Sequence, residues 1–215
     1  MRGQLYNELS KLDVKTIFDI GACDFHDSID LLNRYPQARV LAIEADPENY
    51  FRHHKRAETV GIETFNYAMS DKNGYETFYP SLVETERNIE WKYAGSIMKP
   101  LVKPNTNEGV NHPVSFDLEG IQIPSIRFDY FCDTHKIEKV DFVFMDVEGA
   151  EYKIIESLGK YRPKLIFCET AHYDTKSFDN ELNLEEFDSL MESYGYFIVE
   201  RLQYDTLYKY DGNFN

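Results

Sequence analysis

Short apolar runs alternate along the chain with segments of helical periodicity. Runs of this length with little polar interruption are typical of strands buried on both faces of a parallel sheet. The segments between them have the spacing of amphipathic helices. The pattern therefore predicts an α/β fold, a doubly wound and mostly parallel Rossmann-like sheet, in one domain over residues 1–215. The apolar runs fall at residues 15–20, 39–44, 62–67, 140–145 and 163–168.

Polar residues mark where several elements begin. Asp46, with a proline at the first helical position, is expected to start a helix, and Asn183 is expected to start another with a capping box. Ser125 is expected to cap a further helix. Residues 1–13 predict a short N-terminal helix. Residues 196–202 and 205–210 predict a closing antiparallel hairpin.

The periodic pattern is lost between residues 80 and 120, where prolines, glycines and asparagines gather around Trp91, the only tryptophan. A loop-rich insertion of this length in a compact domain usually has a function. We therefore expect a lid on the substrate side of the site. The alternative is a surface excursion that Trp91 anchors to the body of the protein.

Acidic residues lie at the carboxyl ends of the first two apolar runs. In a doubly wound sheet, ligands bind at the carboxyl ends of the strands. Asp19 and Gly21 end the first run, and the turn after them is expected to present free backbone N–H groups to a ligand. Glu44 ends the second run and can accept both hydroxyls of a ribose. Because Asp19 replaces the first glycine of the dinucleotide fingerprint, a ligand with a base, a ribose and a cationic end, such as S-adenosylmethionine, fits better than a dinucleotide.

Several segments resemble motifs of the FkbM-type S-adenosylmethionine-dependent methyltransferases, in the order found in that family. They read DIGA at 19–22, IEADPEN at 43–49, NYAMSDKNG at 66–74 and FVFMDVEGAEYKIIESL at 142–158. AGSIMKP at 94–100 also resembles part of that family's substrate-side insertion. The resemblance implies a class I methyltransferase that methylates a hydroxyl on a sugar or another small molecule.

The same resemblance implies roles for individual residues. One group of residues would bind the cofactor along its amino-acid end, its ribose and its adenine. In chain order these residues are Asp19, Gly21, Ala22, Cys23, Glu44, Ala45, Asn66, Ala68 and Met69. Asp146 would lie beside the methyl donor and the incoming hydroxyl. This chain has Phe25 where the family commonly has glycine. Either the turn swings wide there, or the cofactor is bound loosely or differently.

Asp146, Glu169 and His172 are the candidate catalytic residues. Asp146 ends the fourth apolar run and is expected to act as a base or to orient the substrate, although a role as helix N-cap is the alternative. His172 follows the fifth run and is a candidate general base because its unperturbed pKa suits the task. Asp146 and Glu169 together suggest a divalent cation, but two solvated carboxylates are the favoured interpretation, so no metal ligand is assigned.

The charge of the chain limits its partners. Asp and Glu number 38 against 23 Lys and Arg, a net charge of −15, with no basic cluster. Nucleic acid and membrane partners are therefore not expected, and a small-molecule or carbohydrate acceptor is. The three cysteines lack metal-site spacing and suggest a reducing compartment. With no signal peptide or transmembrane run, the chain is expected to be cytoplasmic. The sequence does not predict an oligomeric state.

Two other functional classes stay open from the sequence. A non-catalytic or degenerate S-adenosylmethionine-binding protein is suggested by Phe25. An oxidoreductase of the NAD type on a similar sheet is the other alternative.

Overall fold

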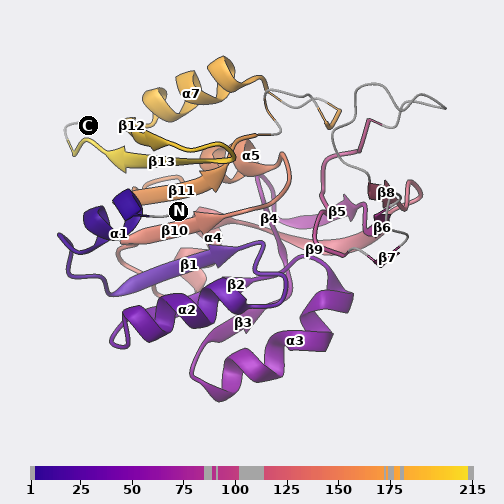
Figure 1. The fold of residues 1–215 in the computed structure, drawn as a ribbon, viewed down its shortest axis with the longest axis horizontal. Helices are drawn as coiled ribbons and strands as arrows, with labels where there is room; N and C mark the ends of the chain where they lie inside the picture. Colours follow the sequence, from indigo (N-terminus) through magenta and orange to yellow (C-terminus); the bar gives the residue numbers. More distant parts are fainter. Residues whose placement is uncertain are drawn as a thin grey trace.

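The computed structural model describes residues 3–84, 89–90, 92–101, 114–171, 173, 177–179 and 182–212. Helices and strands alternate through most of this part of the chain (Figure 1). The helices are α1 (Gly3–Leu9), α2 (His26–Arg34), α3 (Pro47–Thr59), α4 (Phe128–Thr134), α5 (Glu151–Glu156) and α7 (Leu184–Ser193). The strands are β1 (Thr16–Ile20), β2 (Arg39–Ile43), β3 (Glu63–Phe65), β4 (Ala68–Ser70), β5 (Gly74–Phe78), β6 (Ser81–Glu84), β7 (Ile89–Glu90), β8 (Val114–Phe116), β9 (Ile121–Arg127), β10 (Phe142–Met145), β11 (Leu165–Glu169), β12 (Tyr196–Arg201) and β13 (Asp205–Tyr210).

A central sheet dominates the fold. In the described part of the chain it has seven strands in the order β12-β13-β11-β10-β1-β2-β3. The five strands from β11 to β3 run parallel, and the hairpin of β12 and β13 closes the sheet in the antiparallel sense. The predicted mostly parallel, doubly wound sheet is confirmed. The strand order reverses between β1 and β10, so the carboxyl ends of these strands lie at the position where such sheets bind ligands.

Helices cover both faces of this sheet, which explains the uninterrupted apolar runs. Helices α1, α2 and α3 bury side chains such as Leu9, Leu31 and Ala57 against one face. Helices α4, α5 and α7 bury others, among them Phe131, Ile155 and Phe187, against the opposite face. Figure 1 shows α2 and α3 beside β2 and β3, and α7 beside β12. Successive residues of each strand therefore enter different cores, and nearly all of them are apolar.

A second sheet corrects the expectation about Ser125. Strands β4, β9 and β5 pair within it, so residues 66–74, named above only as a motif, contain the strand β4 and the start of β5. Ser125 lies in β9, paired with Ala68 and Gly74, and the N-cap of α4 is Arg127. Expecting Ser125 to cap the helix was wrong, because the alternating pattern of residues 121–127 extends a strand up to the first helical residue.

The insertion also contains regular structure. Within its described residues, β6 pairs with β7 and with β8 to form a small sheet (Figure 1). The expected absence of periodic elements from 80 to 120 is therefore wrong for this part. These strands are two to four residues long, too short for an alternating pattern to stand out in the sequence.

The other predicted helix starts agree with the structure. Asp46 caps α3 by accepting the backbone N–H of Glu48, and Asn183 forms a capping box with Glu186 at α7. None of the helices in the described residues has the length and apolar character needed to cross a bilayer.

Candidate active site

A cavity lies beyond the carboxyl ends of β1, β2 and β10. It is open to solvent and is lined by residues that end or directly follow these strands, among them Ile20, Ile43 and Asp146. Part of its lining is polar, with Glu44, Asp46 and Asn49 at the start of α3. Another part is apolar and includes Met69 and Phe78. The cavity therefore offers a polar and an apolar surface side by side, as a nucleoside requires.

Gly21 allows the β1 turn to lie against the end of β10. Its φ is +86°, and a Cβ at this position would be 1.8 Å from the backbone oxygen of Asp146. The N–H groups of Gly21 and Ala22 donate to the carbonyl of Ile43 at 2.9 and 3.1 Å. The expectation that these two groups are free for a ligand was therefore wrong, because they join the turn to β2.

Glu44 binds the same turn from the end of β2. Its Oε2 accepts the N–H of Cys23 at 2.7 Å, and its Oε1 accepts the N–H of Asp46 at 2.7 Å. The side chain is buried, and burial raises its pKa to about 8. Each carboxylate oxygen can accept more than one hydrogen bond, so Glu44 can brace both loops and still receive a ligand hydroxyl at the cavity wall.

The other predicted cofactor residues divide into two groups. Cys23, Ala45, Ala68 and Met69 line the cavity together with Gly21 and Glu44. Asp19, Ala22 and Asn66 are not part of that lining. The Asp19 side chain is fully buried beneath the turn and accepts the hydroxyl of Ser28 from α2, and Asn66 donates to the carbonyl of Glu44 at 2.8 Å. These contacts support the cavity wall from behind.

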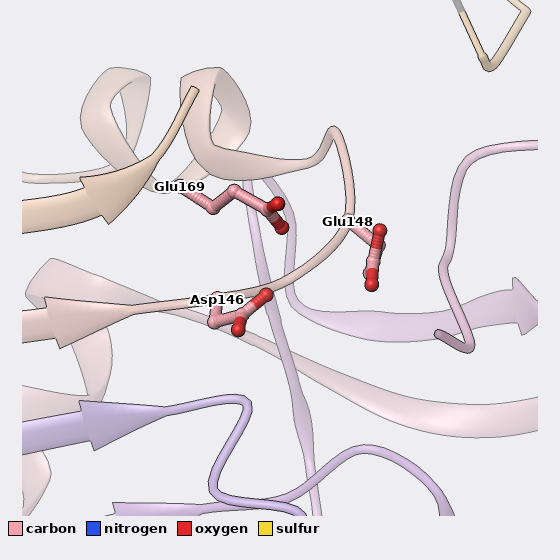
Figure 2. A group of neighbouring side chains, drawn as sticks. All are labelled: Asp146, Glu148 and Glu169. Carbon is pink, nitrogen blue, oxygen red and sulfur yellow. The ribbon is translucent and has the colours of Figure 1, made fainter. Parts of the chain in front are cut away.

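Three carboxylates converge at the ends of β10 and β11. Asp146 directly follows β10, Glu169 is the last residue of β11, and Glu148 lies on the loop after Asp146. Figure 2 shows their side chains directed into a common space. One oxygen from each lies within 4.8 Å of an oxygen from the other two. Asp146 and Glu148 also line the cavity. The structure thus brings together two predicted catalytic residues and adds Glu148 to them.

The position of Asp146 perturbs its ionisation. Its side chain is exposed at the cavity, and the carboxylates of Glu148 and Glu169 lie close to it. Loss of hydration and the charges of Glu148 and Glu169 raise the pKa of Asp146 well above its usual range. Ala150 rather than Asp146 is the N-cap of α5, so the alternative role as a helix cap was wrong. A carboxylate with a raised pKa at a strand end is suited to proton transfer.

Glu151 braces the loop that carries these acids. It is fully buried and accepts the N–H of Val147 at 3.1 Å and the hydroxyl of Tyr173 at 3.0 Å. The loop is therefore held from the side of the core, which fixes the direction of the neighbouring carboxylates.

Residues 92–98, which we call the strap, form another wall of the cavity. Asn49 donates to the carbonyl of Lys92 at 2.7 Å, and Ser96 donates to the carbonyl of Glu148 at 2.7 Å. Part of the insertion thus lines the cavity, and its action as a lid stays a prediction. Asn49 and Ser96 both lie in segments that resemble family motifs, but an isolated amide or hydroxyl has no sequence pattern that predicts these contacts.

The ring of Phe25 does not enter the cavity. Phe25 is the N-cap of α2 in the left-handed conformation, with φ of 63°, and its buried ring packs against Tyr50 at 6.3 Å between centroids. The substitution of the family's glycine therefore adds apolar contact behind the turn and leaves the cavity lining unchanged. His172 and Trp91 lie outside the described residues.

Comparisons with known proteins agree with this architecture. A family model described as "Methyltransferase FkbM domain" matches residues 19–198. The 2-O-methyltransferase NoeI of Sinorhizobium fredii is 30% identical over 192 residues, which cover 89% of this chain and 76% of that protein. Methyltransferase sdnD of Sordaria araneosa is 25% identical over 165 residues, covering 70% of this chain and 62% of that protein.

Among solved structures, a precorrin-6y C5,15-methyltransferase from Geobacter metallireducens is similar over 97% of this chain and 86% of that one, with 15% identity and a TM-score of 0.47. The residues matched by the family model include the turn at Gly21, the loop that begins at Glu44 and the strap. They also include residues 146–150, which carry Asp146 and Glu148 and which we call the acidic loop. This chain therefore belongs to the FkbM methyltransferase family and is an S-adenosylmethionine-dependent methyltransferase.

Proposed function

We propose that this protein transfers the methyl group of S-adenosylmethionine to a hydroxyl of a neutral sugar or another uncharged small molecule. The observation that carries the proposal is that Glu44, Asp146 and Glu148 line the same cavity. The relative from Sinorhizobium fredii is named a 2-O-methyltransferase, which supports oxygen as the accepting atom.

The lining of the cavity fits this cofactor. Ala68, Met69 and Phe78 provide an apolar surface for the adenine, and Glu44 provides acceptors for the ribose hydroxyls. Asp19, Gly21 and Ala22 would shape the turn that bounds the amino-acid end. The acidic loop provides negative charge for the sulfonium.

The chain itself contributes orientation and proton removal. When bound, the cofactor supplies a methyl group already activated on a positive sulfur. Asp146 would accept the proton of the acceptor hydroxyl as the oxygen attacks the methyl carbon. The negative charges of Glu148 and Glu169 would raise the pKa of Asp146, so that its carboxylate accepts a proton more readily. His172 remains a second candidate for the base.

The charge around the reaction centre restricts the acceptor. Three carboxylates within 4.8 Å repel a phosphorylated or carboxylated molecule. Tyr93, on the strap, is 55% exposed and also lines the cavity, so its ring can stack on the apolar face of a sugar. Neutral acceptors are therefore favoured over anionic ones.

A divalent cation is a second candidate for activating the acceptor hydroxyl. Asp146, Glu148 and Glu169 provide oxygen ligands of the kind that such cations prefer, grouped closely enough to share one ion. Exhaustive chelation followed by addition of Mg²⁺ or Mn²⁺ would decide: a rate that is lost and then restored supports the cation, and an unchanged rate excludes it.

Transfer from a methyl-labelled cofactor tests the proposed function. Neutral sugars, their phosphate esters and primary amines are offered in parallel, and labelled products are identified by mass spectrometry. We expect label only on oxygen of neutral acceptors. Asp146→Asn should lower transfer by about 10²–10³-fold while the product S-adenosylhomocysteine still binds in calorimetry.

Glu156→Gln, an exposed acid on α5, is the matched control and should retain full activity. Label on nitrogen, or equal transfer by Asp146→Asn and the wild type, contradicts the proposal. Cofactor binding without transfer to any acceptor would favour the non-catalytic alternative.

A further inference from the structure

Ser96 connects the strap to the acidic loop by a hydrogen bond from its side chain. It is 1% exposed, its Oγ donates to the carbonyl of Glu148 at 2.7 Å, and the N–H of Met98 donates to the same Oγ at 2.9 Å. The hydroxyl is thus both donor and acceptor, so its direction is fixed. It links two segments that are 52 residues apart in the chain.

The residue that receives this hydrogen bond has a strained backbone. Glu148 has φ of 54°, a left-handed conformation that is unfavourable for a residue with a side chain. Gly149 follows with φ of 91°, and a Cβ there would meet the ring of Phe178 at 2.9 Å. A strained conformation persists only where its surroundings impose it. The Ser96 hydrogen bond on the carbonyl of Glu148 is one such constraint.

We propose that Ser96 is a positioning residue that holds Glu148 in this conformation and so directs its carboxylate toward Asp146 and Glu169. The proposal rests on the proposed function, in which these carboxylates surround the sulfonium and the acceptor hydroxyl. Ser96 belongs to the strap, the cavity wall that would face the acceptor. Through Ser96, the strap therefore sets the arrangement of charges at the reaction centre.

Ser81, in β6, provides a matched control that also contacts the strap. It is also a buried serine, and its Oγ accepts the N–H of Ala94 at 3.1 Å. Both serines thus hold the strap, but the hydrogen bond of Ser81 joins it to Ala94 and not to the acidic loop. A purely structural role predicts the same effects for Ser81→Ala and Ser96→Ala.

The charge of the cofactor provides a readout that needs no acceptor. S-adenosylmethionine carries the positive sulfonium, and S-adenosylhomocysteine is its neutral counterpart, so the ratio of their dissociation constants measures the negative charge near sulfur. We expect Ser96→Ala to reduce the preference for the charged form by about fivefold, because Glu148 is no longer held in place. Ser81→Ala should leave the ratio unchanged.

A double-mutant cycle and hydrogen exchange complete the test. In a Glu148→Gln background, Ser96→Ala should have no further effect on the ratio, since the charge it positions is gone. Amide exchange should accelerate in residues 146–151 for Ser96→Ala and only in the strap for Ser81→Ala. Melting temperatures identify any variant that fails to fold.

The outcomes separate the two proposals. If the wild-type protein binds neither form of the cofactor, the proposed function fails. If it binds both, and Ser96→Ala leaves the ratio unchanged or changes it equally in the Glu148→Gln background, the positioning role of Ser96 is overturned and the proposed function stands.

Discussion

At the scale of single residues, Glu44 combines a buried position with a task that needs its charge. Burial raises its pKa from the ordinary value of 4.5 to about 8. Between these pH values the folded protein binds more protons than the unfolded chain. The contribution of Glu44 to the free energy of unfolding therefore decreases as the pH rises through this range. Its ionised form, however, is the better acceptor for two ribose hydroxyls.

The affinity for S-adenosylhomocysteine should consequently increase with pH. Calorimetry between pH 6 and pH 8 should show a dissociation constant that falls by up to about tenfold per pH unit, as Glu44 loses its proton. Glu44→Gln should bind weakly at every pH, with little pH dependence. A wild-type affinity that is flat over this range would contradict the role assigned to Glu44.

Gly21 permits a second prediction about a single residue. Gly21→Ala would place a Cβ 1.8 Å from a backbone oxygen, so the turn or the end of β10 must move. We expect a loss of several kcal/mol in the free energy of unfolding, measured by denaturant titration. Gly61→Ala is the control: its φ is +101°, but nothing lies within 4 Å, so only the backbone penalty of about 1 kcal/mol applies. Equal losses in the two variants would show that the close approach to Asp146 is unimportant.

At the scale of elements, the turn between β1 and α2 depends on packing as well as on backbone freedom. Cys23 and Phe25 both adopt left-handed conformations without being glycine. The buried Phe25 ring, which contacts Tyr50, offsets this penalty by filling the core between α2 and α3. The turn of this chain is therefore stabilised by the packing of a side chain at a left-handed position.

Two substitutions separate these effects. Phe25→Ala loses the ring and keeps the left-handed penalty, so it should lower the free energy of unfolding by about 3–5 kcal/mol. Phe25→Gly loses the same ring but relieves the penalty, and should be less destabilising by about 1 kcal/mol. Both should bind S-adenosylhomocysteine within about twofold of the wild type when folded, because the ring lies outside the cavity lining. Greater stability of Phe25→Ala than of Phe25→Gly would contradict this account.

At the scale of the whole molecule, the chain has an excess of acidic residues, and its candidate active site contains a cluster of three carboxylates. The chain has a formal net charge of −15 at pH 7. Self-repulsion of this kind opposes the compact state and is screened by salt. The same field disfavours anionic acceptors and favours the charged cofactor over its neutral product.

Salt should therefore stabilise the cofactor-free protein. Raising NaCl from about 0.01 M to about 0.15 M shortens the Debye length from about 30 Å to about 8 Å. We expect the melting temperature at pH 7 to rise by a few degrees. Near a pH where the net charge vanishes, the same change should have little effect. A decrease at pH 7 would show that specific ion pairs outweigh the general repulsion.

The sequence by itself determined the layers of the fold and predicted several of the residues that line the cavity, among them Gly21, Glu44 and Asp146. Continuous apolar runs can only be buried on both faces, and Asp46 and Asn183 carry their capping chemistry locally, so these elements followed from the pattern. Tertiary structure alone decided that Gly21 and Ala22 donate to Ile43, that Glu148 joins Asp146 and Glu169, and that Ser96 reaches the acidic loop. Each of these contacts joins segments distant in sequence or depends on one backbone angle, and no local pattern of residues encodes either.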